Sequence, residues 1–96
     1  MRVVIKPSTN KNKKYTAIFY DGDKKVKTSS FGDSRYSDYT QHKDKKRRDR
    51  YRTRHKKDLE TGDYMKPGFL SYYILWGDST SLKTNISKYK KRFNLK

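Results

Sequence analysis

The alternation of hydrophobic and polar residues divides the chain into an N-terminal part typical of strands and a C-terminal part typical of helices. β-Branched and aromatic residues gather at residues 3–5, 14–20 and 24–31, which predicts three strands. The turn at residues 21–23 contains Gly22 and predicts a hairpin between the second and third strands. We expect an antiparallel meander over residues 1–35, whose third strand points its lysines outward to protect an exposed edge.

Residues 38–59 contain neither Gly nor Pro and are rich in good helix formers, which predicts one long helix. The polar connection before it offers three N-cap candidates: Ser37, Asp38 and Thr40. Tyr51, His55 and Leu59 are spaced i, i+4 and i+8 and form one stripe. We therefore expect the C-terminal half of the helix to pack on the sheet and the final helix. The N-terminal half is polar all round and should project toward a partner.

The last third of the chain predicts two shorter helices. Residues 69–76 read FLSYYILW; the pattern alone also fits a buried strand, but Pro67 at the start and Gly77 at the C′ position favour a short helix. Leu82, Ile86, Tyr89 and Phe93 then fall on one face of a final helix, capped by Ser79 or Ser81. The predicted fold is one α+β domain over residues 1–96: meander 1–35, basic helix 38–59 and helical part 68–95.

Charge is concentrated in residues 43–57, which carry ten basic residues against Asp44 and Asp49, half of the formal net charge of +16. The ten are Lys43, Lys45, Lys46, Arg47, Arg48, Arg50, Arg52, Arg54, Lys56 and Lys57. A field of this strength attracts polyanions such as nucleic acid, an anionic membrane surface or an acidic protein surface. We expect these residues to bind a polyanion.

Three interpretations of the basic stretch remain open. Its lysines and arginines would bind a phosphate backbone and release condensed counterions, or dock on an acidic protein surface, or form only a solvated helix face. Guanidinium forks match phosphate in a bidentate way, which favours nucleic acid, DNA or RNA. No zinc-finger, homeodomain or RNA-recognition signature is present, so sequence-specific readout is not expected.

The residues that usually carry catalysis are scarce. There is no cysteine, and His42 and His55 are too far apart on one helix to share a metal. Their imidazolium forms should be disfavoured in so positive a field. Asp38, Asp44 and Asp49 could in principle bind a metal cation together, as carboxylates do in nucleases. Their arginine neighbours are expected to neutralise them instead. We expect no catalytic residue, no metal and no cofactor, and thus no enzyme.

Nine Tyr, four Phe and one Trp predict a folded domain with a thin core, which a partner would complete. Tyr15, Phe19 and Tyr20 are expected in the core rather than on a base-stacking platform. Trp76 is expected as a packing anchor or as an interface residue. The longest apolar run, residues 69–76, is too short to span a membrane, and the N-terminus has too short an apolar run for a signal peptide. The protein is therefore not expected to be secreted.

Most of the chain after Phe31 resembles a known family. The segments FGDSRYSDYTQHKDKKRRDRYRTRHKKDL and PGFLSYYILWGDSTSLKTNISKYKKRF are similar to small basic proteins encoded by large DNA viruses of algae and protists. The resemblance is carried by FG followed by DYT, by HKD followed by R-x-R-Y-x-x-R-H, by the WGDSTSL stretch and by the final Tyr-Lys and Arg-Phe helix. The function of that family is unknown.

The resemblance implies a context rather than a mechanism. It implies a location in the virion, core or capsid, or in the infected host cell, and two roles: genome condensation or a minor capsid (cement) protein that bridges larger capsid proteins. It also marks a set of functional or packing positions: Asp44, Arg48, Arg50, Tyr51, Arg54 and His55.

Overall fold

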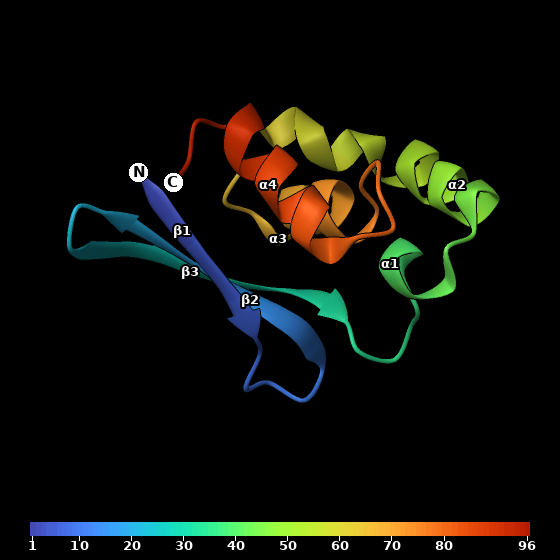
Figure 1. The fold of residues 1–96 in the computed structure, drawn as a ribbon, viewed down its shortest axis with the longest axis horizontal. Coiled ribbons are helices and arrows are strands. Elements are labelled where there is room, and N and C mark those ends of the chain that lie inside the picture. Colours follow the sequence, from blue (N-terminus) through green and yellow to red (C-terminus); the bar gives the residue numbers. More distant parts are fainter.

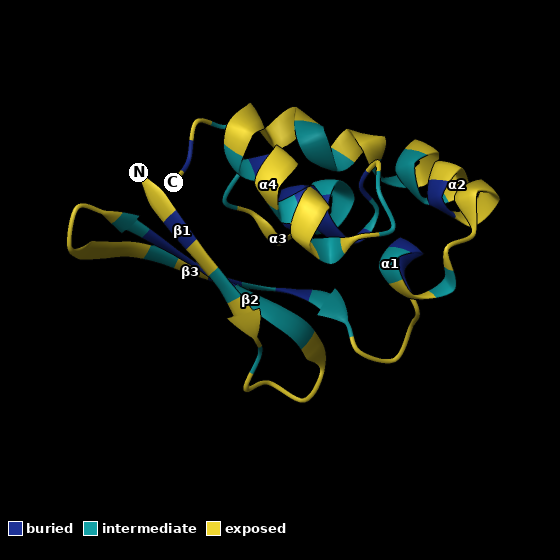
Figure 2. Ribbon diagram, viewed as in Figure 1, coloured by how far each residue is buried: buried dark blue, intermediate teal, exposed yellow.

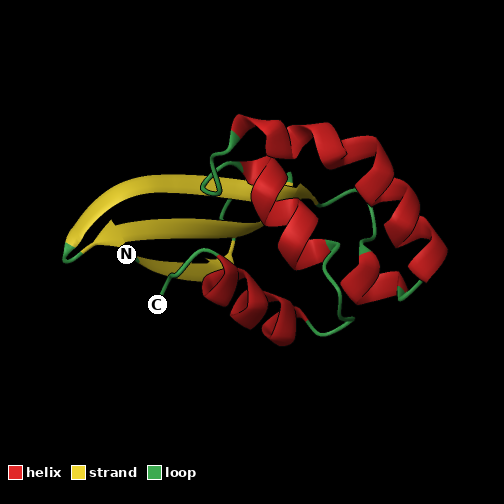
Figure 3. Cartoon of the chain, turned by 90° about the horizontal axis from the view of Figure 1, so that it is seen from above, coloured by secondary structure: helices red, strands yellow, loops and turns green.

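A computed structural model describes all 96 residues and shows a three-stranded antiparallel sheet covered on one face by helices (Figure 1). The strands are β1 (Arg2–Pro7), β2 (Lys13–Asp21) and β3 (Lys24–Asp33), in the order β1-β2-β3. A meander followed by helices confirms the predicted α+β fold. The β2–β3 hairpin extends beyond the helical layer (Figure 3).

The helices follow the sheet in the chain. They are α1 (Tyr39–His42), α2 (Lys45–His55), the 3-10 segment η1 (Lys56–Thr61), α3 (Pro67–Leu70), the π-helical segment η2 (Ser71–Leu75) and α4 (Leu82–Arg92). Segment η1 continues α2, and η2 continues α3, so that residues 67–75 form the predicted short helix. None of these helices combines the length and the apolar composition needed to cross a membrane.

The inner face of the sheet holds the side chains that meet the helices. Phe19 pairs with Val3 on β1, and both are buried, as the alternation along β2 predicts. On β3 the predicted orientation of the lysines is wrong for Lys27. A β-bulge at Phe19 and Tyr20 shifts the register, so that Lys27 lies opposite Phe19 on the inner face, while Val26 is left exposed.

The hydrophobic core lies between the sheet, α3–η2 and α4 (Figure 2). Its buried members are Val3, Ala17, Phe19, Phe31, Leu70, Ile74, Leu75, Tyr89 and Leu95. Leu82, Ile86 and Phe93 pack against it, which confirms the apolar face predicted for α4. None of the core residues comes from α2 or η1.

The predicted continuous helix over residues 38–59 is wrong in one respect. It breaks at Lys43, whose backbone is left-handed with φ 59°, and restarts with Asp44 as the N-cap of α2. The Asp44 carboxylate accepts hydrogen bonds from the backbone N–H groups of Lys46 and Arg47. Asp44 therefore starts α2 by capping it, and Asp38 starts α1 through a capping box.

The loop between η2 and α4 is held by one buried side chain. Asn85 on α4 donates hydrogen bonds to the carbonyls of Ile74 and Ser79 and accepts one from the Ser79 N–H. Gly77 lies against it: a Cβ there would stand 2.3 Å from the Tyr73 carbonyl oxygen. The predicted C′ position of Gly77 is correct, but the need for glycine comes from this close approach.

Candidate functional site

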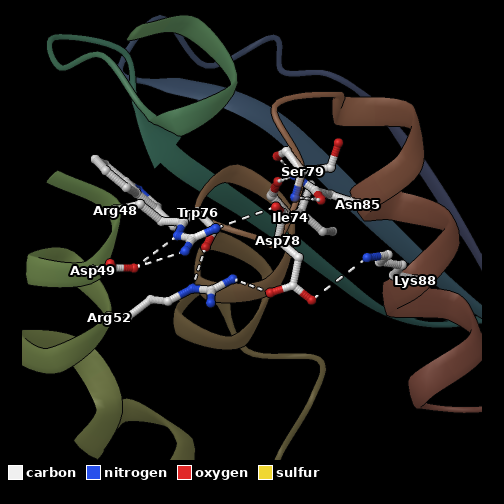
Figure 4. A network of polar contacts seen from close by, with 9 residues as sticks. All are labelled: Arg48, Asp49, Arg52, Ile74, Trp76, Asp78, Ser79, Asn85 and Lys88. Carbon is white, nitrogen blue, oxygen red and sulfur yellow. Dashed lines mark hydrogen bonds and ion pairs between the residues drawn. The ribbon is translucent and has the colours of Figure 1, made fainter. Parts of the chain in front are cut away.

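Eight of the ten basic residues of the 43–57 stretch are exposed to solvent and form no ion pair within 4.0 Å. They are Lys43, Lys45, Lys46, Arg47, Arg50, Arg54, Lys56 and Lys57. The other two, Arg48 and Arg52, point from α2 into the protein (Figure 4). The structure thus separates a free set of cations from a pair that belongs to the fold.

Arg52 joins α2 to the end of η2. Its Nε donates to the carbonyl oxygen of Trp76 at 2.8 Å, and Nη2 donates to the Asp78 carboxylate at 2.9 Å (Figure 4). Trp76 is the C-cap of η2, so its carbonyl is one of the acceptors that a helix end leaves without an internal partner. A cation at this position also complements the negative end of the helix dipole.

Arg48 is buried although it was expected among the projecting residues. Its guanidinium donates to the Asp49 carboxylate at 3.0 Å and to the Asp78 carbonyl at 3.4 Å, and lies 4.9 Å from the centre of the Tyr39 ring. These contacts replace the water that the charge loses on burial. The N-terminal half of α2 is therefore also attached to the rest of the protein, and the prediction that it projects freely is wrong.

Asp78 connects the two arginines to α4. Its carboxylate lies 2.9 Å from Arg52 Nη2 and 3.8 Å from Lys88 Nζ (Figure 4). The hydrogen bond from Arg52 holds the pKa of Asp78 below its ordinary value. Because Asn85 fixes the backbone on either side, Asp78 and its neighbouring carbonyls present a rigid acceptor surface to α2.

A column of aromatic rings accompanies the arginine contacts. The Tyr51 ring stacks on Trp76 with centres 4.2 Å apart and planes 6° apart, and His55 stacks on the other side at 4.2 Å. Burial raises the pKa of Tyr51 to about 12. Tyr51 and His55 thus belong to the face that seats α2, but Tyr51 packs on Trp76 at the end of η2 and not on the sheet and the final helix as predicted. Leu59 lies in η1, half-buried beside a shallow hollow and outside the core.

His42 lies 5.3 Å from Trp76, measured between ring centres. Its Nδ1 accepts a hydrogen bond from the Asp44 N–H at 2.9 Å, which places the ring proton on Nε2. That Nε2 is buried and has no hydrogen-bond partner. Burial lowers the pKa of His42, and the charge of Arg47 lowers it further, while Asp44 and Asp38 oppose the shift. His42 is therefore held neutral at the junction between α1 and α2.

A cleft of about 520 Å³ opens between α2, the end of β3 and the turn at residues 33–38. Arg47 and Arg54 line its α2 side, and Lys13 and Tyr36 line the opposite side. Lys13 and Tyr36 are not among the site residues predicted from the sequence. Both lie in polar segments without periodicity, and only the fold brings them to the basic helix. The one available signal was an aromatic residue within the polar run DSRYSD.

The three aspartates considered above as a cation site each form a structural contact. Asp38 lies 2.6 Å from Lys14 Nζ, Asp44 caps α2, and Asp49 binds Arg48. His42 and His55 lie on opposite sides of the Tyr51–Trp76 pair. Nowhere in the structure do three His, Asp or Glu side chains gather in a way that could hold a metal ion.

Comparison with known proteins gives one match. The model of a family of unknown function, DUF5754, matches residues 3–55, the part that runs from β1 to the end of α2. No significant match was found among curated proteins or among solved structures. The matched part contains the free cations of α2 up to Arg54, together with Lys13 and Tyr36.

The first prediction separates the arginines of the fold from those of the surface. Arg52→Ala removes hydrogen bonds to Trp76 and Asp78 and should lower the free energy of unfolding by about 2 kcal/mol. Arg50→Ala removes an exposed arginine of the same helix and should change the free energy of unfolding by less than about 0.5 kcal/mol. Urea denaturation followed by circular dichroism measures both. Equal effects of the two substitutions would contradict the assignment.

The second prediction concerns pH. Because the folded pKa of His42 is below the ordinary value, the unfolded chain takes up the proton first as pH falls. The free energy of unfolding should therefore decrease as pH falls from about 6.5, and level off below the folded pKa. Urea midpoints measured from about pH 7.5 to pH 5 test this. His42→Gln should remove this part of the slope and His55→Gln should not; a slope that survives His42→Gln would rule the explanation out.

Proposed function

Because the chain belongs to the DUF5754 family, whose function is unknown, we propose its function from its own residues: it is a non-enzymatic protein that binds the nucleic-acid backbone through α2 and η1. The observation that carries the proposal is the set of eight exposed, unpaired cations, seven on α2 and η1 and Lys43 just before them, on a segment that Arg48, Arg52 and Tyr51 hold in place. The closely spaced phosphates of a nucleic-acid backbone suit such a surface, because lysine and arginine neutralise them.

The way the helix is held supports a binding role over a merely solvated face. Arg48 and Arg52 bind the loop after η2, and Tyr51 stacks on Trp76, so that the opposite face of α2 has a fixed orientation. Because the backbone that carries the cations is already ordered, less conformational freedom is lost when they meet a partner. Mutual repulsion among them destabilises the free protein, and a polyanion relieves it.

The contacts offered are suited to backbone rather than to base sequence. Lysine and arginine donate to phosphate oxygens, and arginine does so in a bidentate way. Phosphate contacts position a protein on nucleic acid but carry no sequence information. The proposed binding is therefore independent of sequence, to DNA or RNA.

A second candidate function is a minor capsid protein that bridges larger viral proteins, in line with the resemblance to proteins of large DNA viruses. The sheet favours it, because helices lie over only one of its faces (Figure 1), and Val4 on β1 and Val26 on β3 are 37% and 44% exposed. Such a face suits contact with another protein. The common context of both candidates is the virion or the infected host cell.

The third prediction tests backbone binding by its salt dependence. On a log–log plot, the affinity for a random-sequence duplex should fall linearly with salt concentration. Lys46→Ala/Arg50→Ala should weaken binding and make the slope shallower by about 2, one unit for each lost phosphate contact. Fluorescence anisotropy of a labelled duplex at several salt concentrations measures both.

The matched control removes the same charge elsewhere. Lys24→Ala/Lys25→Ala lies at the β2–β3 turn, which extends away from the helices, and should leave the slope nearly unchanged. Equal losses in the two variants would show that net charge alone drives binding. Affinity without salt dependence would exclude the proposed mode.

The fourth prediction separates the two candidate functions. Stepwise dissociation of purified virus particles should leave a backbone-binding protein with the genome after the shell has been removed, and high salt should release it. A capsid protein should instead leave with the shell at a fixed ratio to a larger protein. Quantitative mass spectrometry of each fraction distinguishes the outcomes, and recovery with the shell would overturn the primary proposal.

A further inference from the structure

We propose that the cleft beside α2 takes one unpaired nucleotide, so that the protein binds single-stranded nucleic acid in preference to a duplex. The inference rests on the proposed function and specifies the form of nucleic acid. It is carried by three features of the cleft: its uncompensated positive charge, its exposed aromatic ring and its size.

The charge of the cleft follows from its ion pairs. Two of the three carboxylates in its lining form ion pairs with a lysine or an arginine, Asp33 with Arg35 and Asp38 with Lys14, and the third, Asp58, lies 3.0 Å from Nδ1 of the His55 ring. Lys13, Arg47 and Arg54 also line the cleft, are exposed and form no ion pair. The three free cations come from both walls, Lys13 from β2 and the two arginines from α2. An anionic group between the walls is therefore attracted from both sides.

Tyr36 supplies the aromatic surface. Its side chain lines the cleft and is 66% exposed, and every other aromatic residue of the chain is buried or half-buried. The rings of Tyr51 and Trp76 also line the cleft, but they are stacked on each other. The Arg35 guanidinium lies 5.7 Å from the centre of the Tyr36 ring, and the exposed remainder of this ring is the aromatic surface that a base can stack on.

Tyr36 is exposed, but hydrogen bonds hold the turn that carries it. The Arg35 N–H donates to the Asp33 carboxylate at 2.9 Å, and the Tyr36 N–H donates to the Asp33 carbonyl at 3.2 Å. Ser34 donates hydrogen bonds to the carbonyls of Lys11 and Asn12, in the loop between β1 and β2. Because the turn is already ordered, stacking on Tyr36 costs less conformational freedom than it would on a loose loop.

The size and position of the cleft fit a nucleotide that has left the stack. A volume of about 520 Å³ lies within the range of small-molecule sites, about 300–1,000 Å³. A base inside a duplex is stacked and presents only an edge, whereas an unpaired base can lie against Tyr36 while its phosphates reach Arg47 and Arg54. The exposed outer face of α2 needs only phosphates and accepts either form. The cleft therefore adds affinity for the single strand alone.

The fifth prediction measures this preference. A labelled oligothymidylate long enough to span the 40 Å length of the protein is compared with a duplex of the same length by fluorescence anisotropy. The single strand should bind more tightly. Tyr36→Ala should lower its affinity roughly tenfold, the size of one base–aromatic stacking contact, and leave duplex affinity unchanged. Tyr36→Phe keeps the ring and should retain the preference.

A charge-matched pair of variants tests the phosphate contacts. Arg47→Ala/Arg54→Ala removes two cleft cations, and Arg50→Ala/Lys57→Ala removes two cations of the same region that do not line the cleft. The first should reduce single-strand affinity more than duplex affinity, and the second should reduce both alike. Equal binding of the two nucleic acids, or a Tyr36→Ala effect that is absent or the same for both, would overturn the inference while leaving backbone binding intact. Failure of both nucleic acids to bind at low salt would overturn the proposed function as well.

Discussion

The contact between two arginines of α2 and the backbone after η2 determines how the basic helix sits on the protein. Arg52 satisfies the carbonyl of Trp76 at the end of η2, and Arg48 donates to the carbonyl of Asp78, two residues further on. Asn85 fixes that stretch of backbone from the opposite side. A helix with almost no apolar residues is thereby attached through polar groups that would otherwise lack partners. The Tyr51–Trp76 stack reinforces the same attachment.

This attachment has an electrostatic consequence for the rest of the helix. Charge that faces the protein is compensated by Asp49, Asp78 and backbone carbonyls, and charge that faces away has no internal partner. The side of the helix on which a basic residue lies thus decides whether it attaches α2 to the protein or stays free on the surface. The division does not follow the N- and C-terminal halves of the stretch, because Arg48 and Arg52 alternate along the helix with exposed residues such as Arg50.

The sheet and α4 could be predicted because their periodicity directly reflects which side is buried, as at Phe19 and Tyr89. The break at Lys43 could not, because Asp44 suits an N-cap as well as a helical ion pair, and the choice depends on tertiary contacts around His42. The burial of Arg48 depends on a carbonyl 30 residues away, which no local pattern contains. The place of Tyr36 in the cleft could not be predicted for the same reason, since its neighbours across the cleft are distant in sequence.

The absence of α2 from the hydrophobic core has a consequence for cooperativity. Separating α2 from the body would break hydrogen bonds and one aromatic stack but expose little core surface, so the change in heat capacity would be small. Such an element opens as its own unit, below the free energy of global unfolding. Amide hydrogens of α2 then exchange through subglobal opening, whereas those of β2 and α4 exchange only when the whole domain unfolds. A bound polyanion would slow exchange in α2 first, so protection there reports occupancy of the surface directly.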